Sequence, residues 1–265
     1  DIEPLPNGNI LVIAWERKTD TEAYAVGRQS IDNSLNEMWA EAILEVEPVG
    51  TNEANIVWEW HIWDHLIQDV DPALPGFGVI SEHPELQDVN YGNAGTSQGP
   101  GGPTGDWKHL NAINYNSELD QIVISSRFHD EIYIIDHSTT TAQAATHSGG
   151  NSGMGGDILY RWGNPSNYGM SGSQIIDNAV HHARWITNDG RPNGGYRQFF
   201  NNSGVRNSVS AIDGIETPWD AATNTYLRTA GQAFAPSSYT TRYECAYSSS
   251  GQSASDRMSN GNIYV

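Results

Sequence analysis

The chain has 265 residues and a mass of 29.0 kDa, which suits one large domain or two small ones. Its formal net charge is −19, with 13 Lys and Arg residues against 32 Asp and Glu residues. This balance argues against nucleic acid as a partner, because no basic stripe is present to displace counterions from phosphates. The single cysteine, Cys245, excludes an internal disulfide and a Cys-based zinc site. No apolar run is long enough to span a membrane.

Short runs of β-branched and aromatic residues, separated by Gly, Asn and Pro, predict an all-β protein. In chain order, we expect strands at 10–15, 42–47, 56–61, 110–114, 121–125, 131–136, 158–162, 182–185, 197–201 and 208–212. One segment, 32–46, has helical periodicity, although the same residues also suit a loop that leads into a strand.

The strands recur as units of strand, turn, strand, turn and strand, and the clearest unit runs from His109 to Asp136. The turn Asn7-Gly8-Asn9 also recurs as Asn260-Gly261-Asn262. Repeats of about 40–50 residues with four strands each predict a β-propeller, with a β-sandwich as the competing all-β fold. We expect one propeller domain over 1–265, with long Gly- and Asn-rich loops near 75–105 and 142–156 that shape access to a central cavity.

Both ends of the sequence have the pattern of a secondary-structure element that the sequence includes only in part. Asp1 opens in a turn before a strand, and 262–265 reads as a strand that has just begun. No signal-peptide pattern is visible at Asp1. We therefore expect a mature or truncated chain that covers most but not all of the propeller, with sequence missing at one end or both.

Imidazole and guanidinium groups stand where predicted strands begin, at His109, His182 and Arg206, with Arg127 and His65 as further candidates. The innermost strands of a propeller face its central channel, so these side chains would converge there. Imidazole can act as a nucleophile or a general acid and base near neutral pH, and the guanidinium fork suits sulfate oxygens. The alternative to a functional role is a structural one, in which the histidines form hydrogen bonds between blades and Arg206 forms a salt bridge. Strand alternation also leaves open whether His181 or His182 faces inward.

Other side chains give weaker indications. Asp69-Val70-Asp71 and Asp130-Glu131 have oxygen atoms that suit Ca²⁺, but no EF-hand pattern is present, and we predict no metal site or cofactor. Six tryptophans could form an aromatic floor for a phenol ring, although packing between blades is the more common use of such residues. They are Trp58, Trp60, Trp63, Trp107, Trp162 and Trp185.

Several segments together resemble a known family. The pattern Asp106-x-x-His109-x-Asn111-Ala112-Ile113, followed by Ser126-Arg127, is similar to the bacterial arylsulfotransferase propellers. The segments 181–185 and 202–206 extend the resemblance, as do 58–66, 160–165 and 257–262. Each segment alone is a weak indication, and the resemblance rests on the order and spacing of all of them.

The resemblance implies a six-bladed propeller that moves a sulfuryl group from a phenolic sulfate ester to a phenol, without a nucleotide donor. By motif, His109, His182 and Arg206 would be the catalytic group. Arg127, His65 and Asn111 would bind the substrate. Such a protein is expected to be secreted, periplasmic or on the cell surface, with a small aromatic sulfate ester and a phenol as its partners.

The resemblance places the transferring histidine in a later blade, yet no histidine follows His182. Three interpretations follow from this difference. The nucleophile lies outside the chain, another histidine takes its role, or the protein is a non-catalytic propeller that serves as a secreted or cell-surface binding or structural module. A hydrolase of sulfate or phosphate esters is a further alternative.

Overall fold

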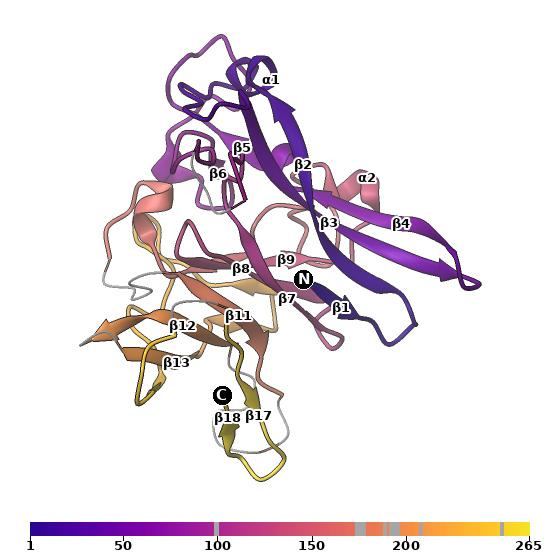
Figure 1. The fold of residues 1–265 in the computed structure, drawn as a ribbon, viewed down its shortest axis with the longest axis vertical. Helices are drawn as coiled ribbons and strands as arrows, with labels where there is room; N and C mark the ends of the chain where they lie inside the picture. Colours follow the sequence, from indigo (N-terminus) through magenta and orange to yellow (C-terminus); the bar gives the residue numbers. More distant parts are fainter. Residues whose placement is uncertain (98–100, 173–178, 188–189, 191–196, 207–208, 250–251) are drawn as a thin grey trace.

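The main strands of the protein form three four-stranded antiparallel sheets (Figure 1). The computed structural model describes residues 1–97, 101–172, 179–187, 190, 197–206, 209–249 and 252–265, with the backbone alone for 197–206. The first sheet has the order β1 (Ile2–Pro4), β2 (Ile10–Thr19), β3 (Glu37–Val49) and β4 (Glu53–His61). The second has the order β10 (Tyr160–Trp162), β9 (Glu131–Asp136), β8 (Gln121–Ser126) and β7 (Leu110–Asn116). The third has the order β11 (Val180–Trp185), β12 (Arg197–Arg206), β13 (Val209–Ile215) and β16 (Thr241–Glu244).

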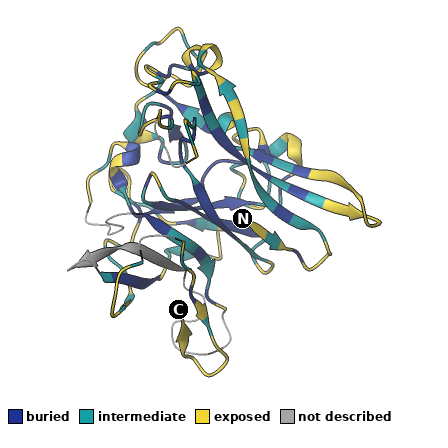
Figure 2. Cartoon of the chain, in the orientation of Figure 1, coloured by how far each residue is buried: buried dark blue, intermediate teal, exposed yellow. Residues whose placement is uncertain are grey.

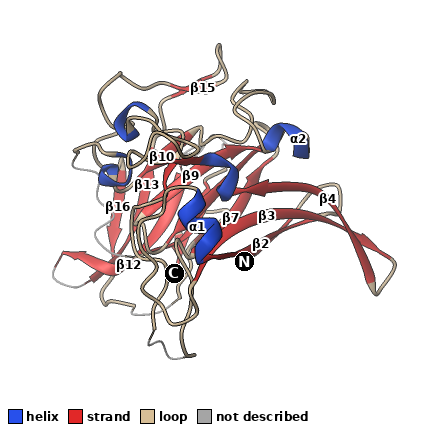
Figure 3. Cartoon of the chain, turned by 90° about the horizontal axis from the view of Figure 1, so that it is seen from above, coloured by secondary structure: helices blue, strands red, loops and turns tan. Residues whose placement is uncertain are grey.

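Three strand pairs and five short helical segments complete the described structure (Figure 3). The pairs are β5 (Leu66–Ile67) with β6 (Gln87–Asp88), β14 (Trp219–Asp220) with β15 (Thr225–Tyr226), and β17 (Asp256–Arg257) with β18 (Ile263–Tyr264). The α-helices are α1 (Asp20–Ala25) and α2 (Thr141–Ala144), and the 3₁₀ helices are η1 (Ile62–His65), η2 (Ile80–Glu82) and η3 (Pro165–Tyr168). Both α-helices begin with a capping box, which satisfies the free N–H groups of their first turns. None of the helices described combines the length and the hydropathy that crossing a bilayer would need.

The all-β prediction is confirmed, and each of the ten predicted strands overlaps an observed one. Of the two interpretations of 32–46, the helix is wrong and the loop that leads into a strand is confirmed. A bend and a turn precede β3, and β3 pairs with β2 on one side and with β4 on the other. Two ladders of backbone hydrogen bonds outweigh a helical pattern of apolar residues, because local propensity is only a weak preference. The described residues do not close into a barrel or a complete propeller.

The repeated Asn-Gly-Asn turn forms the same structure at both places. Gly8 and Gly261 have φ values of 91° and 89°, which suit glycine because it has no Cβ. In each turn the first asparagine accepts a hydrogen bond from the backbone N–H of the second, at 2.9 Å and 3.0 Å. The turns join β1 to β2 and β17 to β18, so the sequence repeat is also a structural one.

Both faces of the β7–β10 sheet are buried. Ile122 and Ile124 of β8 pack in the apolar cluster shared with the first sheet, and Val123 packs in the cluster shared with the third. In β9, Tyr133 and Ile134 divide between the two clusters in the same way. Figure 2 shows these strands as buried throughout, whereas the far end of the β3–β4 hairpin is exposed. Alternation along a strand thus supplies two cores, which explains why these strands read as continuous apolar runs.

A buried ion pair ties β10 to β9 across this sheet. Arg161 donates to both carboxylate oxygens of Glu131, at 2.9 Å and 2.5 Å, and to the carbonyls of Pro84 and Leu86 at 3.3 Å and 3.0 Å. Neither side chain of the ion pair is exposed to solvent. Loss of one partner would leave the other charge buried without compensation.

We therefore predict that Arg161→Ala lowers the free energy of unfolding by about 3–5 kcal/mol. Urea denaturation at neutral pH measures this change. Arg17→Ala is the control, because Arg17 pairs with Glu37 at an exposed site, and such pairs contribute about 1 kcal/mol or less. Equal effects of the two substitutions would contradict a dominant role for the buried pair.

At the end of β4, His61 lies between two carboxylates. Its Nδ1 is 3.1 Å from Glu16 and its Nε2 is 3.1 Å from Glu59. The hydrogen bond with Glu16, opposed by partial burial and reinforced by Glu59, raises the pKa of His61 to about 9. The stabilisation that His61 contributes is therefore complete below its ordinary pKa of 6.5 and is lost as the pH rises through about 9.

We predict that the wild-type protein loses more stability than His61→Gln between these two pH values. Urea denaturation at a series of pH values measures the difference between the two proteins. The comparison with the variant is necessary because other groups, including the buried Glu41, also titrate in this range. Parallel curves for the two proteins would contradict the role of His61.

Candidate functional site

The predicted histidines lie directly before or within two irregular strands, β7 and β11. His109 directly precedes β7 and has a φ of 53°, and the register between β7 and β8 shifts between Leu110 and Ala112. His182 has a φ of 60°, and the register between β11 and β12 shifts between His181 and Arg184. Bulges of this kind re-aim side chains, and left-handed backbone at residues other than glycine is concentrated at functional sites.

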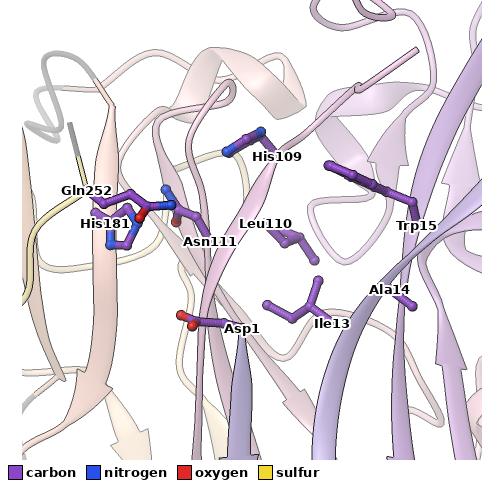
Figure 4. Close-up of a pocket in the computed structure, with 9 residues that line it drawn as sticks. All are labelled: Asp1, Ile13, Ala14, Trp15, His109, Leu110, Asn111, His181 and Gln252. Carbon is purple, nitrogen blue, oxygen red and sulfur yellow. The ribbon is translucent and has the colours of Figure 1, made fainter. Parts of the chain in front are cut away.

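A cavity of about 350 Å³ lies beside these irregularities (Figure 4). Figure 4 shows His109 between Trp15 on one side and His181 and Gln252 on the other. The cavity combines imidazoles and amides with an apolar wall from β2. It is lined by Asp1, Ile13, Ala14, Trp15, His109, Leu110, Asn111, His181 and Gln252.

Asp106 holds His109 in one orientation. The His109 Nδ1 lies 2.5 Å from Oδ2 of Asp106, and the backbone N–H of His109 donates to Oδ1 at 3.1 Å. The Asp106 side chain is buried, whereas that of His109 is 35% exposed. Because Nδ1 faces a carboxylate, Nε2 is the nitrogen left for a ligand. An aspartate that orients an imidazole in this way also stabilises the imidazolium that forms during catalysis.

Glu41 of β3 lies next to this pair, close enough to interact with Asp106. Its Oε1 accepts a hydrogen bond from the backbone N–H of Leu110 at 3.3 Å, and the side chain is fully buried. Burial, with Asp106 as a second cause, raises the pKa of Glu41 to about 8. This shift favours the neutral form of Glu41 beside the Asp106–His109 pair.

The structure places His181, rather than His182, in the cavity lining. His182 accepts a hydrogen bond on Nδ1 from the backbone N–H of Ser255 at 3.2 Å, which attaches the segment before β17 to β11. The Nδ1 of His181 is buried and has no hydrogen-bond partner within the described part of the chain. Burial, with repulsion from His109 and Arg127, lowers the pKa of His181, and burial with the charge of Arg184 lowers that of His182. Both rings are therefore biased towards the neutral form.

Asn111 lines the cavity, but its amide is engaged at both ends. It donates to the carbonyl of Val180 in β11 at 2.8 Å and accepts from the hydroxyl of Ser125 at 2.6 Å. The first bond links β7 to β11 and the second links β7 to β8, so Asn111 helps to set the distance between β7 and β11.

The remaining predicted residues lie elsewhere. Arg127 is half-buried, and its guanidinium lies 5.4 Å from the ring centroid of Phe128, which itself packs 5.0 Å from the His109 ring. His65 is buried between Asp157 and the carbonyl of Ala144, each at 2.8 Å, and does not line the cavity. The side chain of Arg206 falls outside the described residues.

The tryptophans serve mainly as packing. Trp58, Trp60, Trp107 and Trp162 are buried, and each donates its indole N–H to an oxygen of a neighbouring segment. The aromatic ring that the cavity does present is Trp15 on β2, which is 55% exposed.

Comparison of the sequence with models of protein families identifies its family. A model of the arylsulfotransferase (ASST) family matches residues 1–160, more than half of the chain. The chain belongs to the arylsulfotransferase family. This confirms the resemblance inferred from the motifs, and the match includes Asp106, His109, Asn111 and Arg127. Comparison with curated proteins gave no match.

Two cavity features of this arylsulfotransferase-family protein were not predicted as site residues. Asp106 had a signal in the sequence, because it stands three residues before His109 and so can reach the ring from a turn. Trp15 had none, because it lies on a strand of the first sheet and reaches the cavity only through packing of that sheet beside β7.

We predict that the neutral ring of His109 in this arylsulfotransferase-family protein carries its proton on Nδ1, because that nitrogen faces Asp106. Nitrogen-15 NMR of labelled histidine distinguishes the two tautomers. Asp106→Asn should redistribute the proton between the two nitrogens, whereas Glu85→Gln, beside the exposed His83, should leave the His109 signals unchanged. A wild-type ring protonated on Nε2 would contradict the assignment.

Proposed function

We propose that this protein transfers a sulfuryl group from a phenolic sulfate ester to a phenolic acceptor in the cavity between β2, β7 and β11. The observation that carries the proposal is the Asp106–His109 pair at 2.5 Å, which leaves Nε2 of His109 for the substrate. Membership of the arylsulfotransferase family supplies the reaction class.

The cavity suits a small aromatic ester in size and lining. Its volume of about 350 Å³ lies in the range of small-molecule sites. Trp15 and Ile13 offer an apolar wall to an aryl ring, while His109, His181 and Gln252 offer polar groups to the sulfate end. Because the aromatic wall lies opposite the imidazoles, the aryl ring and the sulfate group of the substrate would contact different sides of the cavity.

In the first step we place Nε2 of His109 as the nucleophile. Its lone pair attacks sulfur, an N–S bond forms, and the bond from sulfur to the aryl oxygen breaks with departure of a phenolate. The carboxylate of Asp106 stabilises the positive charge that develops on the ring. In the second step the acceptor oxygen attacks sulfur, the N–S bond breaks, and the acceptor loses its proton to a base in the cavity.

We place the sheets in a six-bladed propeller, with β7 and β11 as inner strands of neighbouring blades. Three four-stranded antiparallel sheets support this arrangement, as do the two apolar interfaces on the faces of the middle sheet. The repeated Asn-Gly-Asn turn before β2 and β18 supports a further repeat of the same unit.

Intact-mass spectrometry after brief mixing with p-nitrophenyl sulfate tests the proposal. The wild-type protein should gain one SO₃, which added phenol removes, and the adduct should map to the peptide that contains His109. His109→Ala should show no adduct, and Asp106→Asn should form it about 100-fold or more slowly because the ring loses its oriented tautomer. His83→Ala is the matched control and should behave as wild type. A folded wild-type protein that gains no SO₃ would contradict transfer through a covalent intermediate.

A non-catalytic binding module is the alternative, and a specific observation favours it. No histidine follows His182, so the later segment lacks the nucleophile that the family resemblance places there. In that case the cavity would bind aryl sulfates, with His109→Ala weakening binding, while no nitrophenol is released.

A further inference from the structure

A second histidine cluster lies apart from the cavity, where the first and second sheets meet. It consists of His65 at the end of η1, His147 in the loop after α2, and Asp157 shortly before β10. The Nδ1 atoms of His65 and His147 lie 2.8 Å and 2.7 Å from the same carboxylate oxygen, Oδ1 of Asp157. All three candidate ligand atoms lie within 4.8 Å of one another, and within the part of the chain that the structure describes this is the one such group.

The orientation of His65 is fixed from several sides. Its Nε2 donates to the carbonyl of Ala144 at 2.8 Å, and its ring stacks on Trp60 with centroids 5.8 Å apart and an angle of 9° between the planes. The side chain has no exposed surface. A metal-binding histidine commonly donates one ring N–H to a carbonyl or carboxylate, which directs the other nitrogen at the metal. His65 has this arrangement, with Nδ1 directed at Asp157.

Two glycines let the loop approach this histidine. A Cβ at Gly156 would lie 2.0 Å from the carbonyl oxygen of Ala144 and 2.6 Å from Nε2 of His65. A Cβ at Gly155, where φ is 62°, would lie 2.1 Å from the carbonyl oxygen of Thr146. The carbonyl of Gly156 also accepts from the indole N–H of Trp60 at 2.6 Å. The loop is therefore fitted closely around the His65 ring.

Other histidine–carboxylate groups in the protein have a different geometry. His61 and His137 each contact two carboxylates through opposite ring nitrogens. A single ion cannot be bound by both nitrogens of one ring, so those groups are hydrogen-bonded bridges. In the second cluster, by contrast, the two imidazoles and the carboxylate converge on one point.

We propose that His65, His147 and Asp157 form a binding site for a divalent transition-metal ion of the zinc class. Two imidazoles and a carboxylate are the ligands that zinc accepts, and three protein ligands leave one position of a tetrahedron open. At zinc–ligand distances of about 2.0–2.2 Å, ligand atoms lie roughly 3.3–3.5 Å apart. Each of the present contacts of 2.7–2.8 Å would open by about 0.6 Å. The His147 side chain, which is 61% exposed, can move by that amount, whereas opening the His65 contact requires a shift of the Asp157 carboxylate.

The bound ion would take the place of the hydrogen bonds between the two Nδ1 atoms and Asp157. It would also clamp the loop between α2 and β10 onto η1. This site is separate from the cavity at His109, because none of its three residues lines that cavity.

Isothermal titration with ZnCl₂ after dialysis against EDTA tests the proposal, with the melting temperature as a second readout. The wild-type protein should bind one zinc ion per chain, and its melting temperature should rise by about 5 °C or more at zinc a hundredfold above the dissociation constant. His147→Ala should weaken binding about 100-fold or more, and Asp157→Asn should do the same. Co²⁺ in place of zinc should give the visible absorption of tetrahedral cobalt in the wild-type protein alone.

The exposed His147 allows the test without damage to the core, and His83→Ala is the matched control, since His83 also pairs with a single carboxylate, Glu85, at 2.8 Å. In EDTA, His147→Ala and His83→Ala should melt close to the wild-type protein. Zinc binding that is unchanged in His147→Ala would overturn the proposal, as would a wild-type protein that binds no zinc or only adventitious zinc without a melting shift. Neither result bears on sulfuryl transfer, which the His109 variants measure.

Discussion

Burial of both faces of the β7–β10 sheet is the constraint on which the rest of the structure depends. Its apolar side chains alternate between two cores, so each polar group at a strand end must find a partner inside the protein. Arg161 meets Glu131, and Lys108 donates to Gln87 and lies 2.9 Å from His129. Burial holds the pKa of Lys108 well below its ordinary value. The polar residues that border this sheet are therefore fixed in position.

The cavity lies where the regular pairing of the strands is interrupted. β11 loses register with β12 between His181 and Arg184, around the left-handed His182, and β7 loses register with β8 between Leu110 and Ala112, directly after the left-handed His109. Asn111 then links the two strands by its bond to Val180. The irregular backbone turns side chains towards the cavity, and the surrounding sheets maintain that geometry. Strain of this kind persists only where the neighbouring structure over-determines it.

The function proposed for this strongly acidic chain requires imidazoles to attract an anion. A net charge of −19 disfavours an approaching sulfate ester at long range, so local groups must provide the attraction. The raised pKa of Glu41 favours its neutral form near His109, and Asp106 orients the ring. The cavity therefore has an oriented imidazole, with the Asp1 side chain also in its lining.

The sequence by itself determined the all-β class, the ten predicted strands and the repeated turn, because alternation and turn residues are local properties. For the same reason it placed His109 directly before a strand. Tertiary structure alone decided that His181 faces the cavity, since the bulge in β11 disturbs the alternation on which such a choice depends. It also brought Trp15 to His109 and His65 to Asp157. These pairs join segments far apart in the sequence, and only the packing of one sheet against another sets their distances.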